Sequence, residues 1–203
     1  MEILITLIAL LLILSFLIKG SFLPRWGVVV VSLLLAVAVR LVIPWLAGQP
    51  AATVNGWISA PDRMLDGAVC VVLEVVLMMT FCFAWPARSS VSLTPLLWFS
   101  SRSLKNARGS ENHPLLRSLL YYPGVLAFPA VCWAWSQLLF ARPGIDFTRF
   151  AWLSAFCTLV VTLGGSWAIR RFLPEEDVRL EGLFLVNLFL LLLTVAATGA
   201  ITF

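Results

Sequence analysis

The sequence predicts an all-α fold, a polytopic transmembrane bundle of six helices. Hydrophobic residues make up 61% of the 203 residues and charged residues 12%, and the mean hydropathy is +1.00. These values lie outside the range of soluble domains. The apolar residues also gather into runs near 20 residues, the length that an α-helix needs to cross a bilayer. The runs are too continuous for the alternating segments of a transmembrane β-barrel, which leaves helices.

The six predicted spans cover, in chain order, residues 3–18, 27–46, 67–85, 119–140, 150–169 and 182–203. The chain is therefore expected to form a single integral membrane domain over residues 1–203. The first run has the length of a signal peptide's apolar region, but Glu2 stands where a positive charge is usual. In addition, Lys19-Gly20-Ser21 offers no small-residue cleavage site, so we expect a retained helix.

Prolines and charges mark the later helices. Pro123 and Pro129 each remove a backbone hydrogen bond, which predicts a kink in the fourth helix. Pro174 ends the fifth helix, and the acidic residues after it lie near the start of the sixth, where negative charge favours the helix dipole. These acids are also expected to neutralise the basic residues around the turn. The acids are Glu175, Glu176 and Asp177, and the basic residues are Arg170, Arg171 and Arg179.

Lysine and arginine are distributed unevenly between the two sides of the predicted bundle. Ten lie after helices one, three and five: Lys19, Arg25, Arg88, Arg102, Lys105, Arg108, Arg117, Arg170, Arg171 and Arg179. The opposite side carries three: Arg63, Arg142 and Arg149. Under the positive-inside rule, loops one, three and five are cytoplasmic and both termini are external. Tryptophans at predicted helix ends fit the same boundaries as interfacial anchors: Trp26, Trp45, Trp85, Trp152 and Trp167.

The second and third runs each carry one charge, and the two charges lie at matched depth. Arg40 and Glu74 are each seven residues from the nearer end of the runs 27–47 and 67–86. In antiparallel helices joined by residues 48–66, both would lie roughly 10 Å inside the membrane from the same face. A lone charge near a helix centre costs about 2.5–3.5 kcal/mol, so we expect an intramembrane ion pair. Either this pair is structural, or Glu74 carries a proton or a cation.

Small polar residues form a stripe on each of the last two predicted helices. On the fifth helix they recur every four residues, and on the sixth they share one face. Such stripes usually allow close backbone approach and interhelical hydrogen bonds, so we predict one packed seam between these two helices, with a polar conduit as the alternative. The seam residues are Ser154, Thr158, Thr162, Ser166, Asn187, Thr194 and Thr198.

The longest connection, residues 86–118, is basic and is predicted to be cytoplasmic. Its charges are Arg102, Lys105, Arg108 and Arg117, apart from Arg88 at its start. A juxtamembrane basic cluster binds lipid headgroups or docks a cytoplasmic partner. Nucleic acid is not expected, because the cluster has one nearby aromatic residue and lacks a stacking platform.

The sequence contains few residues that could act in catalysis. His113 is the single histidine, and no serine or cysteine motif accompanies it. Four cysteines lie inside apolar runs without close pairing: Cys70, Cys82, Cys132 and Cys157. These residues cannot supply the ligand spacing of a zinc, haem or iron–sulfur site, so the sequence predicts no catalytic residues, no metal and no cofactor.

These observations predict a non-enzymatic accessory or scaffold subunit of a larger bacterial membrane complex. Its expected partners are the lipid bilayer and other membrane subunits, or further copies of itself. Twelve arginines against two lysines, without a long polar tract, suit a multi-pass protein of a bacterial inner membrane. The alternative is a small transporter or channel that uses Glu74, paired with Arg40, to handle a proton or a cation.

Overall fold

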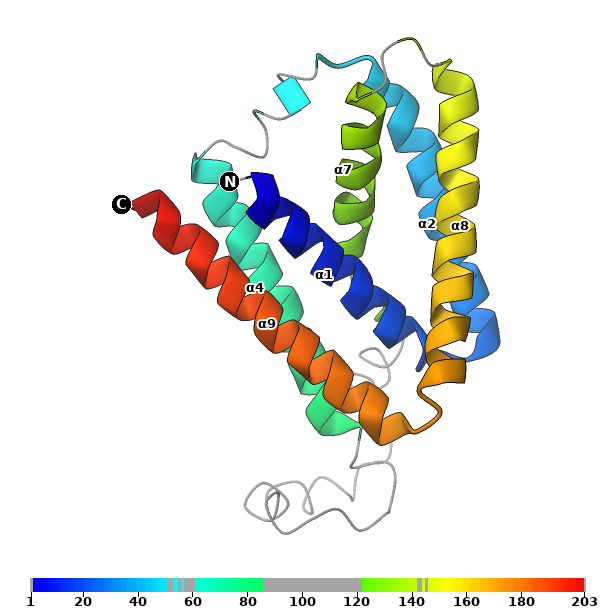
Figure 1. Cartoon of the computed structure of the whole chain (residues 1–203), viewed down its shortest axis with the longest axis vertical. Coiled ribbons are helices and arrows are strands. Elements are labelled where there is room, and N and C mark those ends of the chain that lie inside the picture. Colours follow the sequence, from blue (N-terminus) through cyan, green and yellow to red (C-terminus); the bar gives the residue numbers. More distant parts are fainter. Residues whose placement is uncertain are drawn as a thin grey trace.

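The computed structural model describes residues 2–50, 53, 54, 56, 61–85, 122–141, 144 and 146–202, and this part of the chain is all-helical. Six helices make up the described fold (Figure 1). They are α1 (Glu2–Gly20), α2 (Arg25–Ala47), α4 (Pro61–Ala84), α7 (Ala127–Phe140), α8 (Phe147–Phe172) and α9 (Glu176–Thr202).

Five of these helices are long and apolar enough to cross a membrane, which confirms the prediction of a multi-pass membrane protein. Their candidate spans are Ile3–Gly20, Arg25–Ala47, Leu65–Phe83, Phe147–Phe172 and Glu176–Gly199. In an apolar 18-residue stretch of each span, no more than 33% is buried within the protein. Much of each helix surface is therefore apolar and exposed, as expected for helices that face lipid.

The sixth helix, α7, differs from the prediction. It has 14 residues, about 21 Å at 1.5 Å per residue, and starts at Ala127 rather than at 119. Pro123 disfavours a helical backbone at Tyr122, and Gly124 has a φ of 97°, so residues 122–126 are not helical. Pro129 lies in the first turn of α7, where a missing N–H is tolerated. The prolines thus help to set the start of a short helix instead of kinking a long one.

Helix α1 lies between two groups of helices (Figure 1). On one side α2 packs along α8 and α7, and on the other α4 packs along α9. Helix α1 itself contacts α9, α7 and α8. Helices that are consecutive in the chain are therefore not always neighbours in the bundle.

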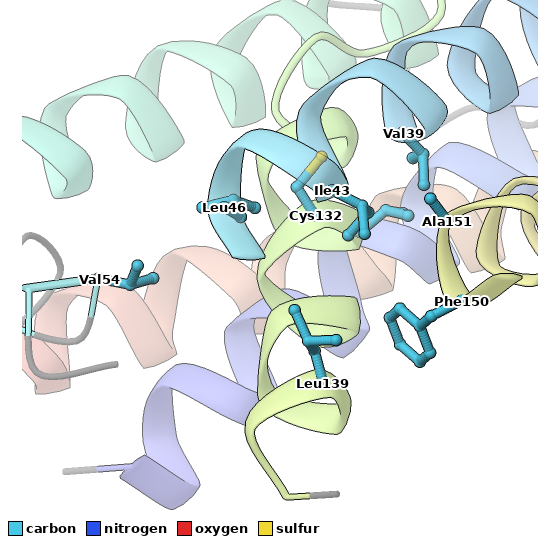
Figure 2. Packing of buried hydrophobic residues seen from close by; sticks show 9 residues of the cluster. Val39, Ile43, Leu46, Val54, Cys132, Leu139, Phe150 and Ala151 are labelled. Atoms are coloured by element: carbon cyan, nitrogen blue, oxygen red, sulfur yellow. The ribbon is translucent and has the colours of Figure 1, made fainter. Parts of the chain in front are cut away.

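Apolar side chains fill both sides of α1. Figure 2 shows the cluster in which Val39 and Ile43 of α2, both fully buried, meet Cys132 of α7 and Ala151 of α8. A second cluster joins four helices: Ala9 of α1, Val75 of α4, Ala130 of α7 and Leu190 of α9. Because helices in lipid associate through packing rather than through water exclusion, these clusters hold the two groups to α1.

Two arginines donate hydrogen bonds to backbone carbonyls at the C-terminal end of α1. The Nε of Arg170 donates to the carbonyl of Ser21 at 2.9 Å, and its Nη2 donates to the carbonyl of Leu23. Arg179 donates to the same Ser21 carbonyl at 3.1 Å, while its Nη2 lies 4.0 Å from Oε1 of Glu176. Cations at a helix C-terminus satisfy its last carbonyls and favour its dipole. Backbone carbonyls, more than the acidic run, are thus the principal partners of these arginines.

Candidate functional site

Glu74 lies at the middle of a membrane-spanning helix. It is nine residues from either end of the Leu65–Phe83 span, and its side chain is buried, with 6% exposed. That distance corresponds to about 13 Å at 1.5 Å per residue, so a bilayer around α4 would place the carboxyl near its midplane. Ionisable groups at this depth are expensive to insert and usually have a function.

The partner of Glu74 is a tyrosine. The hydroxyl of Tyr122 donates to Oε2 of Glu74 at 2.6 Å, and it also accepts a bond from the backbone N–H of Val125 at 3.4 Å. The second bond fixes the phenol against residues 122–125, whose backbone conformation depends on Pro123 and Gly124. A hydrogen bond from a neutral hydroxyl to a carboxylate is short and strong, but it does not neutralise the charge.

Gly124 completes the site from the backbone side. Its φ of 97° lies in the region that favours glycine. A Cβ at this position would lie 2.8 Å from Oε1 of Glu74 and 3.0 Å from Cε of Met78. The carboxyl therefore packs directly against bare backbone, and both the conformation and the space require glycine here.

The structure does not bring Arg40 and Glu74 together. The guanidinium of Arg40 lies over the ring of Trp152, 4.8 Å from its centroid, and Glu74 has Tyr122 as its partner. The physical reason is the packing order, because α2 is placed against α8 and α7, whereas α4 is placed against α9. Matched depth along consecutive helices was not enough to predict a contact.

Within the described residues, the Glu74 site offers a carboxyl and a phenol and no partner cation. The same residues contain no group of three His, Cys, Asp or Glu side chains that could hold a metal ion. The four cysteines are free thiols. The Glu74 carboxyl can accept a proton, or the oxygens of Glu74 and Tyr122 can bind a small cation.

The polar stripe of α8 is buried, but α9 does not cover it. The hydroxyls of Ser154, Thr158 and Thr162 donate to carbonyls of their own helix at 2.7–3.1 Å. Trp135 of α7 donates to Thr158 Oγ1 at 2.9 Å. At the other end of the stripe, Ser166 lies so close to Gly20 of α1 that a Cβ there would be 2.7 Å from its hydroxyl.

The stripe of α9 contacts α1 through Asn187. The amide of Asn187 donates to Ser15 Oγ at 3.1 Å, and Thr194 and Thr198 bond back to carbonyls of α9. The predicted seam between the last two helices is therefore two separate seams, because α1 contacts both α8 and α9. Each stripe still serves close helix packing, as its residue types indicate.

Sequence reasoning missed the burial of Lys19. This residue is fully buried, with its Nζ over the ring of Phe81 from α4. A lysine in the last turn of a membrane helix commonly extends its ammonium group to the headgroups, so its sequence position gives no sign of burial. Its burial results from α4 and α9, which pack over this end of α1 and could not be placed from local pattern alone.

The basic cluster Arg102, Lys105, Arg108 and Arg117 lies outside the described residues, as do His113 and the rest of 86–118. No protein-family model, curated protein or solved structure matches the chain.

Proposed function

We propose that this chain is a small membrane transporter in which Glu74 takes up and releases a proton during translocation. The observation that carries the proposal is the partner of Glu74: the buried, mid-span carboxyl binds the neutral hydroxyl of Tyr122 at 2.6 Å rather than a cation. An arginine in contact would hold the carboxyl permanently ionised, whereas a phenol bonds to either protonation state.

A proton fits this site better than a metal cation. Metal cations such as Ca²⁺ and Mg²⁺ require about six or more oxygen ligands. Glu74 and Tyr122 are the two oxygen-bearing side chains that the described structure brings together here. Protonation requires one carboxyl oxygen, and it removes the charge that is costly at the membrane centre.

The test is proton flux in proteoliposomes that hold the full chain and a pH-sensitive dye, with a potassium diffusion potential as driving force. Glu74→Gln keeps an acceptor for Tyr122 and removes the titratable group. Asp66→Asn is the matched control, because Asp66 is an exposed acid on the same helix. The proposal requires flux in wild type and in Asp66→Asn and its loss in Glu74→Gln. Equal flux in wild type and Glu74→Gln would refute it.

A second candidate is the accessory or scaffold subunit of a larger membrane complex, and the surface of α4 favours it. Helix α4 packs chiefly along α9 and exposes large apolar side chains over its length. These are Leu65, Val69, Leu73, Val76, Leu77 and Phe83. A partner helix on this surface would cover α4 beside Glu74. Purification in mild detergent from the native host, with quantitation of the copurifying proteins, tests this candidate: a stoichiometric partner supports it, and a partner-free chain contradicts it.

The proposal includes a location and an orientation. Arginine-rich composition and the uneven distribution of basic residues favour a bacterial inner membrane, with loops one, three and five cytoplasmic and both termini external. Because this orientation needs an even number of crossings, it includes α7 as the sixth, in addition to the five long helices. Modification of single cysteines introduced near each terminus by a membrane-impermeant thiol reagent, in a variant without the native cysteines, would test the orientation.

A further inference from the structure

A cavity of about 320 Å³ lies where the end of α2 meets the start of α8. Arg40, Pro44, Ala47 and Gly48 line it from α2 and its C-cap, and Phe147 and Thr148 line it from α8. The four residues from the α2 side follow helical spacing, so they share one face. Because Pro44, Ala47 and Gly48 have short side chains or none, this face leaves room beside Arg40.

The guanidinium of Arg40 is the charged group of the cavity. Its Nε is buried and has no hydrogen-bond partner in the described structure, and the group lies over the ring of Trp152. The acid that caps α8 has other partners: Asp146 accepts from the Thr148 N–H at 3.1 Å and lies 3.4 Å from Arg149. A buried donor without a partner is destabilising, so the cavity favours a ligand with an acceptor.

The position of the cavity restricts the ligand to an amphiphile. Its lining runs from Arg40, seven residues inside the Arg25–Ala47 span, to Gly48 and Thr148 near the ends of two candidate spans, where lipid headgroups meet protein. Around it, large apolar side chains face outward: Leu41, Trp45, Phe147 and Trp152, all more than half exposed. Acyl chains can pack on this surface while an anionic headgroup enters the cavity.

We propose that this cavity binds the phosphate of an anionic phospholipid, with Arg40 as the anchoring residue. Arginine matches phosphate oxygens through its forked N–H groups, and basic pockets between membrane helices are known to hold lipid headgroups. The cavity volume is near the lower limit of small-molecule sites and suits a headgroup rather than a larger ligand. The inference does not depend on the role of Glu74.

The test measures lipid bound to the purified full chain in neutral detergent by native mass spectrometry. The probes are phosphatidylglycerol, diacylglycerol as the same tails without phosphate, and inorganic phosphate. Arg40→Gln should weaken phosphatidylglycerol binding about tenfold or more, the scale of a lost charge-assisted hydrogen bond. Arg149→Gln, an exposed arginine at the same end, should bind like wild type.

Arg40→Gln could lose lipid binding through a folding defect, so a second variant tests the cavity without changing Arg40. Gly48 has a φ of −77°, and a Cβ there would meet only the Trp45 carbonyl at an ordinary 3.5 Å. Gly48→Leu therefore fills the cavity without touching the charge, and it should also abolish lipid binding. The proposal is overturned if both variants bind phosphatidylglycerol like wild type, or if diacylglycerol binds equally well. Arg40-dependent binding of inorganic phosphate without binding of phosphatidylglycerol would overturn the lipid assignment.

Discussion

The hydroxyl of Tyr122 donates a 2.6 Å hydrogen bond to Oε2 of Glu74, a residue 48 positions earlier in the chain. This bond joins the non-helical segment before α7 to the centre of α4. It gives a carboxyl at mid-span a partner that is polar but neutral, and it places the bare backbone of Gly124 against the same group.

Removal of the Tyr122 hydroxyl should destabilise the protein through Glu74. In Tyr122→Phe the buried carboxyl loses its donor, at a cost of about 1–3 kcal/mol in free energy of unfolding. The measurement is a double-mutant cycle of Tyr122→Phe with Glu74→Leu, by reversible unfolding in mixed micelles. Because Glu74→Leu removes the carboxyl, Tyr122→Phe should cost much less in that background. Equal costs in both backgrounds would show that the bond contributes nothing.

Gly124→Ala should destabilise the protein by about 1–3 kcal/mol, because it imposes an unfavourable positive φ and brings a methyl group against Glu74. Gly182→Ala is the matched control, since Gly182 lies within α9 and has open space around it. That control should be neutral or slightly stabilising. The measurement is the free energy of unfolding of the two variants in the same detergent. Equal values would contradict the role given to Gly124.

Arg179→Ala should destabilise the end of α1. The side chain is buried, and it donates to the carbonyl and hydroxyl of Ser21. The loss of hydrogen bonds from a charged donor should cost about 1.5–3 kcal/mol. Arg171→Ala serves as control, because Arg171 is exposed on the last turn of α8. Faster hydrogen exchange of residues 18–23 in Arg179→Ala alone would locate the effect, and equal exchange in both variants would contradict it.

The helices could be predicted from the sequence because their signals are local. Apolar runs of sufficient length located five spans to within a few residues at most ends, although the runs missed the first turns of α4 and α9, which are polar. The start of α7 was predictable in principle from Tyr122-Pro123-Gly124, where a proline and a glycine interrupt the helix. Because the residues on both sides of this break are apolar, a count of hydrophobic residues alone does not detect it.

The partners of the polar residues could not be predicted, because they depend on which helices are neighbours. Arg40 and Glu74 matched in depth but belong to helices packed against different neighbours, and α1 separates the two polar stripes. The choice of α1 as the central helix follows from the sum of many side-chain contacts, and no local pattern in residues 2–20 indicates it. Glu74 itself is buried and lies within a candidate span.

The most direct test of the central claim is whether the carboxyl of Glu74 takes up a proton inside the folded membrane protein. A hydrophobic carbodiimide reacts with protonated carboxyl groups that lie in the membrane, and peptide mass mapping locates the product. Our account predicts modification at Glu74 that increases as pH is lowered and that is absent in Glu74→Gln. No modification of Glu74 at any pH, in protein that remains folded and reacts after unfolding in detergent, would contradict it.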